Sequence, residues 1–95
     1  MNSNTLEYID FAFRSILQKK QVEDFIFHNA LNGLLSFMKS LDSSAEKNLL
    51  YNNYQTIEGV MNILKIYSEG GSCIHDLVEI NFNEFNNLIE QFKLL

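Results

Sequence analysis

The sequence predicts an all-α protein, more narrowly an antiparallel four-helix bundle that forms a single domain over residues 1–95. Three observations favour this fold class. Apolar residues recur at spacings of three and four along most of the chain, which is the period of an amphipathic helix. The chain has no proline and only four glycines, whereas strand-rich folds need many turn residues. Hydrophobic residues make up 46% of the chain, enough for one core closed by short loops.

The first predicted helix covers residues 5–20 and the second covers residues 22–42. Apolar residues of the first helix fall within an arc of about 140° on a helical wheel, which is the width of one buried face. The second helix has a wider apolar face, as expected for a helix with two neighbours. Glu23 and Asp24 lie in its first turn, where acidic side chains suit the helix dipole. The apolar row of the first helix consists of Leu6, Ile9, Ala12, Phe13, Ile16 and Leu17.

The third predicted helix covers residues 44–68. A polar break precedes it, and Ser43 with Glu46 has the spacing of a capping box at its start. Its apolar residues occupy one half of the wheel and its polar residues the other. Gly70 or Gly71 supplies the left-handed backbone residue that commonly ends a helix.

The last predicted helix covers residues 73–94. It is either one helix or two pieces, 73–80 and 82–94, that meet at Asn81. The wheel separates the first piece into an apolar side, expected to face the core, and a polar outer side. The expected inner residues are Cys73, Ile74, Leu77, Val78 and Ile80, and the outer ones are His75, Asp76 and Glu79.

The stretch Cys73-Ile74-His75-Asp76 suggests a catalytic or metal-binding cluster, but helical geometry separates its members. Cys73 and His75 lie about 200° apart on the wheel, so they cannot form a nucleophile–base pair. The one cysteine and two histidines of the chain do not have the spacing of zinc ligands. No phosphate-binding or nucleophile-elbow motif occurs. We therefore expect no catalytic residues, no metal site, no cofactor and no enzymatic activity.

Charge and hydropathy restrict the partners of the chain. Twelve acidic and seven basic residues give a formal net charge of −5. Such a chain is a poor match for nucleic acid or for an anionic membrane, and a basic protein is the better electrostatic partner. The amino-terminal residues lack the basic and apolar regions of a signal peptide, and no apolar run could span a bilayer. We therefore expect a cytoplasmic location.

The acidic residues are concentrated in the last third of the chain. Residues 66–95 contain five acids and a single base, Lys93, so they carry four of the five net negative charges. One interpretation is an ordinary solvated helix face, and the other is a surface that binds a basic protein. The candidate partner-binding residues on this segment are Glu69, His75, Asp76, Glu79, Glu84 and Glu90.

Two phenylalanines add a second candidate surface. Phe11 and Phe25 both lie off the apolar stripes of their helices, among polar neighbours. They either contribute to a protein interface or are covered because their helices pack on two sides. We include both as candidate partner-binding residues.

The stretch "SILQKKQVEDFIFHNAL", with its acidic helix start followed by Phe25, resembles the opening of colicin D-type immunity proteins. The closing "NEFNNLIEQFKLL" resembles their final helix, while the middle of the chain does not align. The chain is also similar to immunity proteins of contact-dependent inhibition systems in being small, acidic, helical and single-domain. This resemblance implies a bacterial inhibitor that binds a secreted toxin, often a basic nuclease, and blocks its nucleic-acid cleft.

Two functions from different classes follow. The first is a non-enzymatic immunity or antitoxin-like protein that neutralises a cognate basic toxin through its acidic surface. The alternative is a helical homodimeric adaptor, chaperone or regulatory protein, in which Phe11 and Phe25 are buried against a second copy. No binding residue is carried over from the resemblance, so the acidic site depends on charge asymmetry alone.

Overall fold

The computed structural model describes residues 3–95, and within that range it contains helices and no strand, which confirms the all-α class. Residues 3–95 form five helices, where four were predicted for the chain. Their bounds are α1 (Ser3–Leu17), α2 (Asp24–Lys39), α3 (Ser44–Asn52), α4 (Tyr54–Ser68) and α5 (His75–Lys93). In the part of the chain that the structure describes, no helix is long and apolar enough to cross a membrane.

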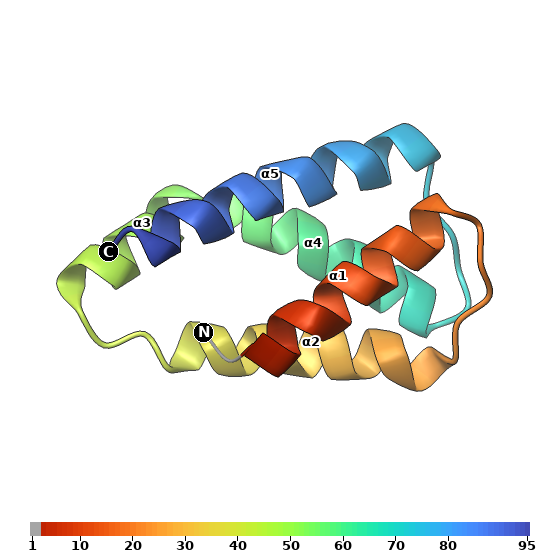
Figure 1. Cartoon of the computed structure of the whole chain (residues 1–95), viewed down its shortest axis with the longest axis horizontal. Coiled ribbons are helices and arrows are strands. Elements are labelled where there is room, and N and C mark those ends of the chain that lie inside the picture. Colours follow the sequence, from red (N-terminus) through yellow and green to blue (C-terminus); the bar gives the residue numbers. More distant parts are fainter. Residues whose placement is uncertain (1–2) are drawn as a thin grey trace.

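The helices form an elongated body with extents of 38 × 23 × 18 Å. In Figure 1, α2 runs along the lower edge, α5 along the upper edge, α4 lies between them and α1 crosses in front. The short helix α3 connects α2 to α4 at one end of the molecule. The main packing contacts join α2 to α4 and α1, and α5 to α4 and α1, so four helices surround one core.

The core is built from the apolar stripes of these four helices. Three aromatic pairs tie them together. Phe13 of α1 stacks on Phe82 of α5 with ring centroids 5.2 Å apart, and Phe37 of α2 meets the edge of Phe92 of α5 at 5.1 Å. Such pairs add to the burial of their rings. The buried core residues are Ile9, Ala12, Phe13, Phe27, Ala30, Leu34, Phe37, Leu41, Ile57, Val60, Ile63, Leu64, Val78, Phe82, Phe85, Leu88 and Ile89.

The first two helices are shorter at their junction than predicted. α1 ends at Leu17 because Lys19 adopts a left-handed backbone with φ of 57°. The amide of Lys20 then donates to the carbonyl of Ser15, as in a Schellman motif. α2 begins at Asp24, after an extended Glu23, and ends at Lys39 rather than at residue 42. The predicted capping box is confirmed, since Ser43 and Glu46 bond each other reciprocally at the start of α3.

The prediction of one helix over residues 44–68 is wrong. The chain forms α3 and α4, which are separated at Asn53, whose φ of −120° and ψ of 23° lie outside the helical region. The side-chain amide of Asn53 donates to the carbonyl of Leu49 at 2.9 Å. A short polar side chain that bonds the local backbone competes with helix continuation in this way.

The last helix is continuous through Asn81, so the alternative of two pieces is wrong. Asn81 is accommodated because its side-chain amide donates to the carbonyl of Leu77 at 2.8 Å. Its side-chain oxygen also lies directly against the α carbon of Gly59 in α4, where a Cβ atom would collide with it. Gly59 therefore allows α4 and α5 to approach closely at this level.

Candidate functional site

The connection between α4 and α5 fixes where α5 begins. Gly70 has φ of 86°, and the amide of Gly71 donates to the carbonyl of Ile66 at 2.9 Å, which is the Schellman arrangement. The left-handed residue that ends α4 is therefore Gly70. The hydroxyl of Tyr67 accepts a hydrogen bond from the Cys73 amide at 3.1 Å. The loop is thus tied back to α4 immediately before α5 starts.

The first turns of α5 expose apolar side chains that were expected to face the core. Ile74 is 76% exposed, Leu77 is 49% exposed and Ile80 is 56% exposed. Of the five residues predicted to face inward, only Val78 is fully buried, and Cys73 is half-buried. α5 also starts at His75, after an extended Ile74, rather than at residue 73 as predicted.

Continuity of the helix explains part of this correction. In one uninterrupted helix, the buried row that includes Phe82 and Phe85 extends backwards through Val78. Ile80 then lies about 200° from Val78 and is outside the row, whereas Leu77 lies only about 20° from the buried Leu88, at the edge of the row. A helical wheel drawn for residues 73–80 alone does not take into account the position of the buried stripe in residues 82–94. Carrying the phase of the stripe over residues 82–92 backwards would have identified Ile80 as exposed, but it places Leu77 at the edge of the buried row.

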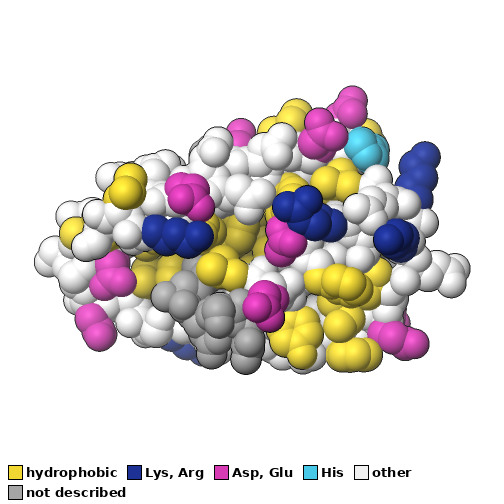
Figure 2. All heavy atoms as spheres, in the orientation of Figure 1, with side chains coloured by type: hydrophobic (Ala, Val, Ile, Leu, Met, Phe, Trp, Pro, Cys, Tyr) yellow, Lys and Arg dark blue, Asp and Glu magenta, His cyan; other side chains and the backbone are white. Residues whose placement is uncertain are grey.

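Acidic side chains surround these apolar ones. Asp76, Glu79 and Glu84 are all exposed, and no lysine or arginine occurs between residues 66 and 92. Figure 2 shows acidic side chains gathered beside hydrophobic ones along the upper right edge, where α5 begins. We call this set the α5 surface, and it consists of Ile74, Asp76, Leu77, Glu79, Ile80 and Glu84. His75 is exposed beside it, with its Nδ1 atom 3.8 Å from Oδ1 of Asp76.

The structure separates the other candidate residues from the α5 surface. Glu69 is exposed on the connecting loop, immediately after α4. Glu90 lies near the opposite end of α5, where its carboxylate is 3.3 Å from the ammonium group of Lys93. Phe11 and Phe25 are exposed on α1 and α2 and form a different surface. The predicted site therefore divides into two surfaces, one separate ion pair and Glu69 on the connecting loop.

The surroundings of Cys73 do not activate its thiol as a nucleophile. Burial raises the pKa of its thiol, which therefore stays protonated and poorly nucleophilic at neutral pH. Among residues 3–95, no group of three or more histidine, cysteine, aspartate or glutamate side chains is placed to hold a metal ion.

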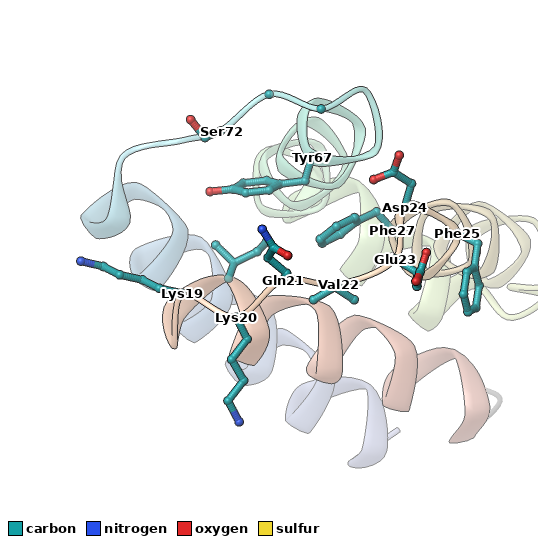
Figure 3. A pocket seen from close by; sticks show the side chains of 13 residues that line it. Lys19, Lys20, Gln21, Val22, Glu23, Asp24, Phe25, Phe27, Tyr67 and Ser72 are labelled. Atoms are coloured by element: carbon teal, nitrogen blue, oxygen red, sulfur yellow. The ribbon is translucent and has the colours of Figure 1, made fainter.

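A broad groove of about 1190 Å³ lies between the α1–α2 and α4–α5 connections. Phe27 and Tyr67 pack against each other within it, with ring centroids 5.6 Å apart. Figure 3 shows the side chains of Lys19 and Lys20 directed away from these rings. A small-molecule site needs a few polar groups that converge on the ligand, and this groove lacks such convergence.

Comparisons of the chain with family models, with curated proteins and with solved structures give no match. Function is therefore inferred from the exposed surfaces of the molecule.

Proposed function

We propose that the chain is a non-enzymatic protein that binds a basic protein partner through the α5 surface. The observation that carries this proposal is that Ile74, Leu77 and Ile80 are exposed at the start of α5, together with exposed acidic side chains. Protein interfaces commonly combine an apolar centre with a polar rim, and adjacent apolar side chains exposed on one helix mark such sites. A helix face that only contacts solvent does not require adjacent exposed apolar side chains.

The charge of the surface specifies the chemistry of the partner. Asp76, Glu79 and Glu84 form a rim of one sign, which accelerates and orients the approach of a basic protein. The same rim opposes nucleic acid, whose phosphates repel carboxylates. The partner should therefore present lysines and arginines around an apolar patch.

We further propose that this partner is a basic toxin domain, which the chain neutralises as an immunity or antitoxin-like protein. A nuclease binds phosphates in a positively charged cleft, and carboxylates that occupy the cleft would exclude the substrate. The proposed scaffold is an antiparallel bundle of α1, α2, α4 and α5 that holds the α5 surface rigid, which reduces the entropy lost on binding.

The test uses the proteins encoded on either side of the gene for this chain, each expressed from an inducible promoter in bacterial cells. We expect one of them to arrest growth and co-expression of this chain to restore it. The purified pair should form a complex whose Kd rises at least about a hundredfold in the triple variant Asp76→Lys/Glu79→Lys/Glu84→Lys. If neither neighbouring protein arrests growth, or if this chain does not restore growth, the neutralising role is overturned.

The matched control is Glu23→Lys/Asp42→Lys/Glu58→Lys, which reverses three exposed acids outside the α5 surface. Both triple variants change the formal net charge from −5 to +1, since each reversal adds two units. Circular dichroism first shows that each variant folds. Equal weakening by both variants would mean that net charge, and not the α5 surface, governs binding.

A further inference from the structure

The outer face of α1 and α2 carries a second set of exposed aromatic side chains. Phe11 is 54% exposed and Phe25 is 55% exposed, with Tyr8 partly exposed beside them. Tyr8, Phe11 and Ile26 line a hollow of about 470 Å³ together with Glu7. In Figure 2 a cluster of hydrophobic side chains is visible at the lower right, over the start of α2 and the adjacent part of α1. We call these aromatic residues and their hollow the α1–α2 surface.

The residues around Phe11 follow a regular order along α1. Glu7, Phe11, Arg14 and Gln18 are spaced by four, three and four positions, so they form one row on the outer face of the helix. All four are exposed. The row therefore places an apolar residue between an acidic residue on its amino-terminal side and a basic residue on its carboxy-terminal side.

This charge order complements itself when a second copy packs in the opposite direction. A two-fold axis at Phe11 places each Phe11 against its counterpart and each Glu7 against Arg14 of the other copy. A parallel arrangement would instead bring like charges together. Self-complementarity of this kind is the requirement for a closed dimer with two identical halves.

Arg14 is already held in position for such a contact. Its Nε atom donates to Oδ2 of Asp10 at 2.8 Å, and its guanidinium carbon lies 5.6 Å from the ring centroid of Phe82. These contacts hold the guanidinium between Asp10 of α1 and Phe82 of α5, and the Arg14 side chain remains 60% exposed. Ordering a side chain before binding lowers the entropy lost in the complex.

The surroundings distinguish this surface from the α5 surface. A second hollow beside Phe11 is lined by two acids, Glu7 and Asp10, and by two bases, Arg14 and Lys20. Acids and bases are therefore equal in number in this hollow beside Phe11, whereas two copies of the α5 surface would bring carboxylates together. From these observations we infer that the α1–α2 surface binds a second copy of this chain through an antiparallel contact of the two α1 helices centred on Phe11.

The test is analytical ultracentrifugation of the full chain over a range from micromolar to millimolar concentration. We expect a reversible monomer–dimer equilibrium, and Phe11→Ser should raise the dimer Kd at least about tenfold. Phe25→Ser should weaken the dimer less, since Phe25 lies outside the central row. Circular dichroism confirms that each variant remains helical. A wild-type chain that stays monomeric throughout, or a dimer unaffected by Phe11→Ser, overturns the inference.

Charge exchange provides a sharper test of the antiparallel register. Glu7→Arg alone and Arg14→Glu alone should each raise the dimer Kd, because each places like charges across the axis. An equimolar mixture of the two variants should form heterodimers, and the double variant Glu7→Arg/Arg14→Glu should recover self-association. Failure of both recoveries overturns the register. The matched control Glu58→Arg, on the outer face of α4, should leave the dimer unchanged, and so should the triple variant of the α5 surface.

Discussion

Glu46 shows how a single side chain connects a helix start to the pH dependence of folding. Its carboxylate accepts hydrogen bonds from the amide and the hydroxyl of Ser43, at 3.1 and 2.9 Å. The Ser43 hydroxyl in turn accepts from the Glu46 amide. The bond from the Ser43 backbone, followed by that from its side chain, lowers the pKa of Glu46 below its ordinary value of 4.5. The folded state therefore favours the ionised carboxylate.

This lowered pKa makes a prediction for Glu46→Gln. As the pH falls, Glu46 is protonated in the unfolded chain before it is protonated in the folded chain. The stabilisation is therefore present above the ordinary pKa of Glu46 and is lost as the pH falls through its lowered pKa in the folded state. We expect Glu46→Gln to be less stable than wild type at neutral pH, and the difference to shrink as the pH falls below the ordinary pKa of 4.5. Urea unfolding across this range measures it. Glu58→Gln, outside any cap, should follow the wild-type profile, and a pH-independent difference for Glu46→Gln would contradict the prediction.

At the scale of the element, α5 has one face buried in the core and another that is exposed and proposed to bind a partner. Phe85 is 1% exposed in the core, whereas Ile80 is 56% exposed one and a half turns earlier. Phe85→Ala should lower the free energy of unfolding by about 3–5 kcal/mol, because it removes buried area and leaves a cavity. Ile80→Ala should change it by less than about 1 kcal/mol, since little area is lost and alanine favours the helix. Urea unfolding compares them, and similar losses would show that Ile80 is not a surface residue.

The helical elements differ in how far the sequence predicted them. Periodicity identified the all-α class, and local chemistry correctly placed the capping box at Ser43 and the end of α4 before Gly71. The break at Asn53 was missed because Leu50 and Ile57 on its two sides keep nearly the same helical phase. Only the backbone angles of Asn53 and its bond to Leu49 separate α3 from α4.

For the α5 surface, the sequence predicted the exposed acidic residues but not the exposed apolar residues among them. Exposure of Asp76 and Glu79 follows from their polarity and helical phase, and the structure agrees. Exposure of Ile80 follows from the phase of the buried stripe, whereas exposure of Leu77 depends on which neighbouring helices cover the first turns of α5, and that is a property of tertiary packing. Phe11 was identified because it departs from an otherwise regular stripe, a signal that the sequence itself contains.

At the scale of the whole molecule, the proposed binding surfaces concentrate features that do not serve folding. The α5 surface gathers like charges, and repulsion between them should destabilise the free protein. Binding sites often retain such a loss in stability because selection acts on function. The α1–α2 surface is different, since Arg14 is paired with Asp10 within one chain. The two surfaces should therefore respond differently to salt.

Electrostatic repulsion on the α5 surface predicts that the double variant Glu79→Lys/Glu84→Lys is more stable than wild type at low ionic strength. Asp76 is left in place because an acidic residue in the first turn of α5 favours the helix dipole. The gain should be about 0.5 kcal/mol, as expected for exposed charges, and should shrink as salt screens the repulsion. Urea unfolding at low and high salt measures this difference.

The matched control is Asp42→Lys/Glu58→Lys, which changes the net charge equally, from −5 to −1, at acids outside the α5 surface. If local crowding of carboxylates is the cause, this control should gain less stability than Glu79→Lys/Glu84→Lys at low salt. Equal gains would instead attribute the effect to net charge over the whole molecule. A loss of stability in Glu79→Lys/Glu84→Lys would show that these carboxylates support the fold, and would remove the argument that they are retained for a partner.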